Sequence, residues 1–290
     1  MLIVGFALAE ALVGLQAMWS RELPRAEVID GVWLPGGTFE YPPALAILQA
    51  SAIPLIVFAF SDGRRWIPFA ALGALSAGAV ISLSGDRLAF GLAAVFLAAM
   101  VIAPSRVGVQ RHATAITVAL VLAGAIVAPA MRSGAPADHR QAAHPRHAAR
   151  TGDVLHGRTH ELSAAFATWM DRPLLGAGAG AYLPASAIHQ GRSAVLFAHD
   201  LPLELAAELG MLGLLLGVAL YLTSGALALG ATTASGAVFL AAPVAAFLAS
   251  NLLDWTWHLA ALSAVWAAAC GALAGARERE KEGRTVWAHR

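Results

Sequence analysis

Eight long apolar runs are the feature that most constrains how this chain folds. The runs cover residues 1–19, 42–60, 66–83, 88–104, 113–130, 203–222, 236–253 and 256–275. A membrane-spanning helix needs about 20 mostly apolar residues, so each run is close to the required length. The runs are rich in Ala and Leu and lack the alternating pattern of a membrane β-barrel strand. The sequence therefore predicts an all-α polytopic membrane bundle of about eight transmembrane helices.

Composition excludes the other broad classes. The chain has 290 residues, of which 58% are hydrophobic and 13% are charged. Soluble domains carry ~25% charged residues and ~45–50% apolar ones, so a water-soluble enzyme or a disordered chain is excluded. The net charge of +1 gives no reason to expect a nucleic-acid partner. Cys270 is the only cysteine, which excludes an intrachain disulfide.

The short segments between the runs carry unequal numbers of basic residues. One set holds nine of them, namely Arg64, Arg65, Arg106, Arg111, Arg277, Arg279, Lys281, Arg284 and Arg290. The opposite set holds Arg21, Arg25 and Arg87. Because cytoplasmic loops carry the excess of Lys and Arg, we expect both termini in the cytoplasm. The long segment 131–200 is then expected on the outer side.

Four parts follow from this pattern. We expect an N-terminal membrane bundle at 1–130, an external loop at 131–200, a C-terminal bundle at 201–276 and a basic cytoplasmic tail at 277–290. In the loop, residues 159–171 (THELSAAFATWMD) repeat apolar side chains at helical spacing. This pattern predicts an amphipathic helix on the outer membrane surface. Pro173 ends the helix, because proline disfavours helical geometry in the residue before it.

The segment HDLPLELAAELG, residues 199–210, has the densest group of ionisable residues beside a span. Asp200 is a plausible helix N-cap, and Glu204 and Glu208, four residues apart, share one helix face. His199 lies just outside this helix, where an imidazole can act as a general base. The alternative is an interfacial histidine before a solvated first turn.

Four arginines are candidates for binding an anion. Arg87 lies in the short turn SLSGDRLAF, and its planar fork of donors suits a lipid phosphate or diphosphate. A pair with Asp86 or a headgroup contact is the alternative. Arg158 and Arg172 flank the amphipathic helix, and Arg192 lies in the same outer loop. Each of these three either faces an anion near the membrane or is a solvated charge.

The remaining polar features carry weaker signals. Asp254, in NLLDWTWHLAAL, either orients an arginine or caps the last helix. The stretch LLGAGAGAY at 174–182 has the wrong spacing for a dinucleotide-binding loop, and we interpret it as a tight backbone bend. Histidines in the loop lack accompanying cysteines and have few carboxylates near them, so we expect no metal site and no cofactor.

The order of these segments resembles the family of bacterial O-antigen ligases and polymerases. The matching segments are His199, Leu203, Glu208 and Gly210; RPLLGAGAGAY from Arg172; Gly157-Arg158 with Trp169; GTFEYPPALA from Gly37; SLSGDRLAF; and DWTWHLAAL, with Ala260 where proline is common. In the fifth, Ser-Gly-Asp-Arg replaces the usual Ser-Arg. Members commonly have more spans than the eight expected here, so the resemblance implies that this chain lacks several N-terminal spans.

The resemblance implies a metal-independent glycosyltransferase of the cytoplasmic membrane that acts on its outer face. The donor would be a glycan on a polyprenyl diphosphate, held with its tail among membrane lipid, and the acceptor a hydroxyl on a glycan, lipid or protein. His199 would accept the proton of that hydroxyl, and arginines, with Arg87 and Arg158 first, would stabilise the diphosphate. Asp200, Glu204, Glu208 and Asp254 would support them.

Two other functions remain open from the sequence. A transporter or flippase of lipid-linked saccharides predicts ionisable residues along a path through the membrane and an internal repeat. Here the charges gather on one face and we find no repeat. A non-catalytic, truncated member of the family is the second alternative.

Overall fold

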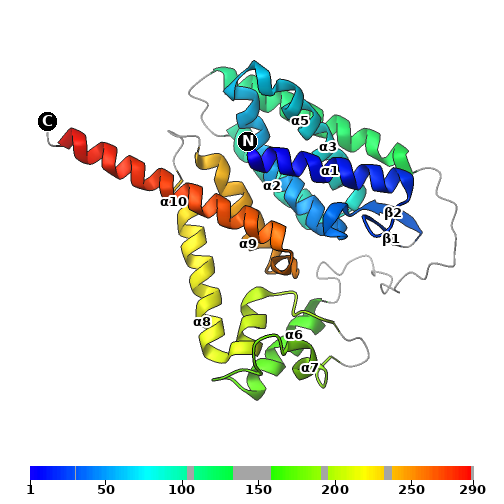
Figure 1. The fold of residues 1–290 in the computed structure, drawn as a ribbon, viewed down its shortest axis with the longest axis vertical. Coiled ribbons are helices and arrows are strands. Elements are labelled where there is room, and N and C mark those ends of the chain that lie inside the picture. The colour runs from blue at the N-terminus through cyan, green and yellow to red at the C-terminus, as the bar shows by residue number, and fades with distance from the viewer. Residues whose placement is uncertain (30, 103–107, 133–157, 191–194, 232–236, 289–290) are drawn as a thin grey trace. The chain divides into compact units, whose positions relative to one another are not determined.

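The computed structural model describes residues 1–29, 31–102, 108–132, 158–190, 195–231 and 237–288 (Figure 1). Its α-helices are α1 (Leu2–Ser20), α2 (Pro42–Asp62), α3 (Ile67–Ser84), α4 (Arg87–Ile102), α5 (Gly108–Val127), α6 (Arg158–Asp171), α7 (Tyr182–Ser186), α8 (Leu201–Leu229), α9 (Ala241–Ser250) and α10 (Ala260–Ala288). Short 3-10 helices are η1 (Gly37–Phe39), η2 (Arg64–Trp66), η3 (Ala128–Arg132), η4 (Ala237–Leu240) and η5 (Thr256–His258). The described part of the chain is therefore dominated by helices.

Each predicted apolar run forms a helix, which confirms the all-α membrane class. Six helical segments of the described residues are long and apolar enough to cross a membrane: Leu2–Ser20, Pro42–Asp62, Arg64–Ser84, Arg111–Ala130, Leu201–Leu229 and Ala260–Glu282. Arg87–Ile102 and Ala237–Ser250 are apolar but shorter. The amphipathic helix predicted at 159–171 is α6, and it ends at Asp171, two residues before Pro173.

A β-hairpin that the sequence analysis does not predict follows α1. Strands β1 (Ala26–Ile29) and β2 (Val32–Pro35) pair antiparallel, with Val28 opposite Trp33. Their β-branched and aromatic residues suit a short strand. Gly31 has a φ of +76°, which glycine adopts without steric cost and a tight turn requires. Four-residue strands are too short for a periodic signal, which is why the pattern misses them.

The chain forms two compact units. One comprises Met1–Arg146, Ala231–Ala246 and Val265–Arg290, and the other comprises His147–Gly230 and Phe247–Ala264. Helix α2 is the centre of the first unit, where it contacts α1, α3, α4 and α5. Within the apolar window of α2, 83% of the residues are buried inside the protein. Such a helix is apolar on all sides because other helices surround it.

Glycines allow α3 and α5 to pack with their backbones in contact. A Cβ atom on Gly78 would lie 1.9 Å from the carbonyl oxygen of Val121, and one on Gly124 would lie 2.0 Å from that of Leu75. Only glycine fits at either position. Small residues at helix crossings are the usual means by which membrane helices approach closely.

The carboxylate of Glu10, buried in α1, is satisfied by residues of η1. Its two oxygens accept hydrogen bonds from the backbone N–H of Thr38, at 2.9 Å, and from the hydroxyl of Thr38, at 2.7 Å. Glu10 is only 6% exposed, so these bonds replace the water that the carboxylate has lost. The pair fixes the turn that leads into α2.

In the second unit, α8 is not one straight helix. Gly210 has a φ of 66° and a ψ of −147°, which interrupts the helix. A Cβ on Gly213 would lie 1.9 Å from the carbonyl oxygen of Leu205, and one on Gly217 would lie 3.2 Å from Cα of Pro202. These contacts are impossible in a straight helix, because 15 residues would separate Pro202 and Gly217 by about 22 Å. The first part of α8 therefore folds back against the second.

The glycine-rich stretch 174–180 packs against this sharp turn. Gly176, Gly178 and Gly180 all have positive φ angles, which confirms the predicted tight bend. Backbone N–H groups of Ala177 and Gly178 donate to the carbonyl oxygens of Ala207 and Glu208, at 2.9 and 2.8 Å. The side chain of Glu208 accepts from the N–H of Tyr182, at 3.1 Å, at the start of α7. The glycine-rich motif that begins at Arg172 and the motif that runs from His199 to Gly210 are thus joined by backbone hydrogen bonds.

Candidate functional site

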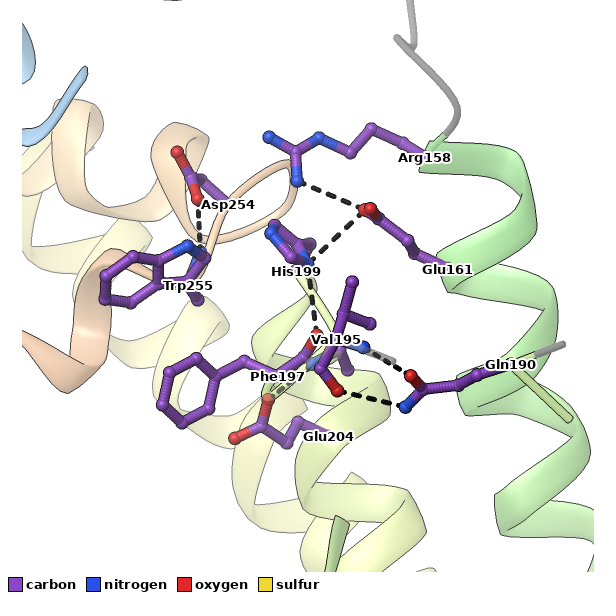
Figure 2. Close-up of polar contacts among 10 residues, drawn as sticks. Arg158, Glu161, Gln190, Val195, Phe197, His199, Glu204, Asp254 and Trp255 are labelled. Carbon is purple, nitrogen blue, oxygen red and sulfur yellow. Dashed lines mark hydrogen bonds and ion pairs between the residues drawn. The ribbon is translucent and has the colours of Figure 1, made fainter. Parts of the chain in front are cut away.

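The first turn of α6 and the loop before α8 bring three ionisable side chains together (Figure 2). Arg158 Nη1 lies 3.1 Å from Oε2 of Glu161, one turn along α6. The same Oε2 lies 3.3 Å from Nδ1 of His199. The His199 side chain is 12% exposed, whereas those of Glu161 and Arg158 are 20% and 24% exposed. The cluster is thus largely withdrawn from water but not fully buried.

Hydrogen bonding fixes the tautomer of His199. Its Nδ1 lies 3.0 Å from the carbonyl oxygen of Phe197. A carbonyl oxygen can only accept, so Nδ1 carries the hydrogen and Nε2 carries the lone pair. Burial, together with the positive charge of Arg158, lowers the pKa of His199 to about 3, and the bond to Phe197 opposes this shift. At neutral pH the ring is therefore uncharged, with its lone pair at Nε2.

The backbone of His199 adopts a conformation that few residues use. Its φ is +57°, in the left-handed region, where a non-glycine residue costs on the order of 1 kcal/mol. Such outliers persist where the surrounding structure holds them, and they cluster at functional sites. Here the start of α8 fixes the residue that follows His199, because the side chain of Asp200 accepts a hydrogen bond from the N–H of Leu203, at 2.8 Å. Asp200 is thus the N-cap of α8, as its position predicts.

A buried glutamine holds the segment before His199. Gln190, at 2% exposure, donates to the carbonyl oxygen of Val195 at 3.0 Å and accepts from the N–H of the same residue. Its side-chain amide also donates to the hydroxyl of Ser186, and its backbone carbonyl oxygen lies 3.0 Å from Nε2 of His160. Both backbone groups of Val195 are therefore fixed two residues before Phe197.

A second histidine lies on the other side of this segment. His258, in η5, places Nε2 2.7 Å from Oε1 of Glu204, whose side chain is 5% exposed. The other oxygen of Glu204 accepts from the N–H of Ala198 at 2.7 Å. The ring of Phe197 stacks with that of His258, at 3.8 Å between centroids, and with that of Trp255, at 5.3 Å. Residues 197–199 are therefore held by hydrogen bonds and by ring stacking.

The two aspartates of the candidate set have backbone partners. Burial raises the pKa of Asp200, and the bond from Leu203 opposes this shift. Asp254 is buried and accepts from the N–H of Trp255 at 2.8 Å, in the turn that leads into η5. Helix α10 begins later, at Ala260, so Asp254 does not cap that helix. The prediction that Asp254 caps the last helix is therefore wrong, because η5 lies between Asp254 and the start of α10.

The candidate arginines that the structure describes lie on different elements. Arg158 lies in the cluster with His199, whereas Arg172 is exposed just beyond the other end of α6, about 20 Å of helix away. Arg87 is the first residue of α4 in the other unit and is exposed, and Asp86 accepts from the N–H of Ala89 at 2.6 Å. Arg192 lies outside the described residues. Within the described part of the second unit, Arg158 shares a carboxylate partner with the candidate base, whereas Arg172 does not.

Glu161, Gln190 and His258 belong to the site but were not among its predicted residues. Glu161 had a usable signal, since it is the acidic residue in the first turn of α6, one turn after Arg158. His258 had only its position close to Asp254, with the same two alternatives, and Gln190 had no signal, because the roles of both depend on contacts between segments far apart in the sequence. In the part of the chain that the structure describes, no group of three or more His, Cys, Asp or Glu side chains is placed to hold a metal ion.

Comparison with known protein families places these elements in a known group. The sequence pattern of the O-antigen ligase family matches residues 72–218, which is half of the chain. The matched region runs from within α3 to within α8 and includes Arg87, Arg158, Glu161, His199 and Glu208. No curated protein and no solved structure matches the chain. The family match confirms the resemblance found in the sequence motifs, and the chain belongs to the O-antigen ligase family of membrane glycosyltransferases.

Proposed function

We propose that this protein transfers a glycan from a polyprenyl-diphosphate donor to an acceptor hydroxyl on another glycan, a lipid or a protein. The observation that carries the proposal is the cluster of Arg158, Glu161 and His199. It combines a neutral imidazole, available as a base, with a guanidinium that can bind an anion. A transfer from a diphosphate requires both kinds of group, because one proton is lost and negative charge develops on the leaving group.

The chemistry assigned to His199 is proton removal from the acceptor. The hydroxyl hydrogen passes to Nε2 while the oxygen forms a bond to the anomeric carbon of the donor. The bond from that carbon to the diphosphate oxygen breaks, and the diphosphate leaves with the electron pair. Direct displacement of this kind inverts the anomeric centre. The carboxylate of Glu161, with Oε2 3.3 Å from Nδ1, stabilises the imidazolium that forms by its negative charge.

Arg158 is assigned to the diphosphate. Its guanidinium has five N–H donors, and the bond to Glu161 uses the Nη1 end, which also orients the plane of the fork. Arg87, Arg172 and Arg192 are proposed as further contacts to the diphosphate or to anionic groups near it. No metal ion is needed in this scheme, because arginines supply the positive charge.

The reaction is assigned to the outer face of the cytoplasmic membrane. The basic residues of the short loops favour a cytoplasmic position for both termini, which places segment 131–200 and α6 outside. On that side the apolar spans would hold the polyprenyl tail in lipid.

The test is glycan transfer by the purified protein in lipid nanodiscs. A polyprenyl-diphosphate oligosaccharide serves as donor, the chelator EDTA is present throughout, and lipid-linked and free glycans are compared as acceptors. We expect transfer by the wild type and its loss in His199→Ala and Arg158→Ala. His189→Ala is the matched control, because His189 also pairs with a carboxylate, that of Asp171 at 2.7 Å, but at the surface.

Three results would contradict the proposal. Wild-type protein that moves intact lipid-linked glycan between leaflets without cleaving it would identify a flippase. Transfer that persists in His199→Ala would remove the base from the mechanism. Transfer that stops with EDTA and returns with a divalent ion would exclude the metal-independent scheme.

Sidedness has a separate test. Ser163 is exposed on α6, so Ser163→Cys in a Cys270→Ser background provides a single reporter thiol. A membrane-impermeant maleimide should label it in intact spheroplasts. Labelling that occurs only after lysis would place α6 in the cytoplasm.

A further inference from the structure

One peptide group connects the candidate base to a buried carboxylate. The carbonyl oxygen of Phe197 accepts the hydrogen bond from Nδ1 of His199, at 3.0 Å. The N–H of Ala198, which belongs to the same peptide group, donates to Oε2 of Glu204, at 2.7 Å (Figure 2). His199 and Glu204 therefore contact opposite ends of the Phe197–Ala198 peptide.

The far end of this connection is His258. Its Nε2 lies 2.7 Å from Oε1 of Glu204, so both carboxylate oxygens accept hydrogen bonds. A carboxylate oxygen accepts, which assigns the hydrogen to Nε2 of His258. The ring of Phe197 stacks on His258 at 3.8 Å between centroids, so the segment and the second histidine also pack together. The Glu204 side chain is 5% exposed, so its carboxylate has little contact with water.

Consecutive hydrogen bonds of this kind strengthen one another. An amide whose N–H donates to a carboxylate has more negative charge on its carbonyl oxygen, so that oxygen becomes a better acceptor. Here the better acceptor holds Nδ1–H of His199. The effect of the carboxylate is thus passed to Nε2, where the acceptor hydroxyl loses its proton. In serine hydrolases a carboxylate orients the imidazole by a direct bond, whereas Glu204 contacts it through a peptide.

We propose that Glu204 is a positioning residue of the transfer reaction, acting on His199 through the Phe197–Ala198 peptide and held in place by His258. The inference rests on the proposed function, since it concerns the efficiency of His199 as a base. In this arrangement Glu204 in α8 and His258 in η5 together position His199, which lies in the loop before α8.

The first test removes the charge of Glu204 and keeps its shape. Glu204→Gln retains an oxygen that accepts from Ala198, and His258 can change tautomer to accept from the new amide. We expect kcat for transfer to fall about tenfold, with KM for donor and acceptor changed by less than about twofold, because a supporting group affects the base and not substrate binding. Asp171→Asn is the matched control, since Asp171 also pairs with a histidine Nε2 at 2.7 Å but on the surface.

The second test uses the more exposed end of the network. The His258 side chain is 33% exposed, so substitutions there disturb the core little. His258→Leu removes the donor to Glu204 and should lower kcat about threefold. His258→Gln can donate an amide N–H to the same oxygen and should restore kcat toward the wild-type value. This rescue tests the network even where Glu204→Gln fails to fold.

The outcomes separate the two proposals. Loss of kcat in Glu204→Gln with normal Asp171→Asn, or loss in His258→Leu with rescue by His258→Gln, supports the inference. Wild-type kcat in Glu204→Gln and in His258→Leu overturns it, while the requirement for His199 still stands. A raised KM with unchanged kcat overturns it as well, because Glu204 would then contact substrate. Transfer that is absent from the wild type overturns both proposals.

Discussion

Oε2 of Glu161 lies 3.3 Å from Nδ1 of His199 and 3.1 Å from Nη1 of Arg158, so one carboxylate oxygen contacts both the candidate base and the candidate diphosphate ligand. The first turn of α6 therefore organises the site. A helix predicted only as an amphipathic surface element carries two of its three ionisable side chains.

Glu161→Gln should lower kcat for glycan transfer by about tenfold. The amide can still accept from Arg158, but it lacks the charge that stabilises an imidazolium at His199. Ser163→Ala, at an exposed position of the same helix, should leave kcat unchanged. Equal rates for Glu161→Gln and wild type in the nanodisc assay would exclude this role for Glu161.

His199 should make the protein less stable in acid. Its pKa in the folded protein is about 3, below its ordinary value of 6.5, so the unfolded chain binds the proton first as the pH falls. Its contribution to stability is therefore complete above about pH 6.5 and is lost as the pH falls toward 3. From pH 7 to pH 5 this loss amounts to about 2 kcal/mol. Thermal unfolding in detergent should show a smaller decrease in Tm over this range for His199→Asn than for the wild type, and parallel decreases would contradict the assignment.

Gly210→Ala should destabilise the second unit by about 2 kcal/mol or more. The glycine has a φ of 66°, and a Cβ there would lie 2.3 Å from the carbonyl oxygen of Leu174, which is backbone and cannot move aside alone. Gly225→Ala is the control on the same helix, because its Cβ would meet nothing within 4 Å. That substitution should be neutral or slightly stabilising, since alanine favours helix. Similar Tm values for the two variants would show that the turn at Gly210 is absent.

Glu10→Ala should destabilise the first unit by about 2–3 kcal/mol. It removes the buried carboxylate and leaves the N–H and the hydroxyl of Thr38, which donate to it in part-buried hydrogen bonds, without their acceptor. Glu22→Ala removes an exposed pair with Arg25 at 3.3 Å, and such surface pairs contribute at most about 1 kcal/mol. The measurement is Tm in detergent for both variants, and an equal effect would contradict the burial argument.

Local patterns in the sequence determined the helices. Apolar length predicted the spans, the side chain of Asp200 predicted the start of α8, and Pro173 predicted the end of α6. The glycines of 174–180 predicted a bend because positive φ angles favour glycine. These features depend on neighbouring residues, so composition and spacing are sufficient to recognise them. The same local signals did not reveal the break at Gly210, which divides an apolar run that appears continuous.

The sequence by itself also placed His199 at the edge of a span and Arg158 before an amphipathic helix, and the motif order indicated the family. Only the tertiary structure decided that Glu161 contacts both and that His258 contacts Glu204. Local structure depends on interactions between residues a few positions apart, and these can be recognised directly from the order of residues in the sequence. Contacts such as Glu204 with His258 depend on how α8 folds back and where η5 packs, and the packing of the whole unit sets those positions.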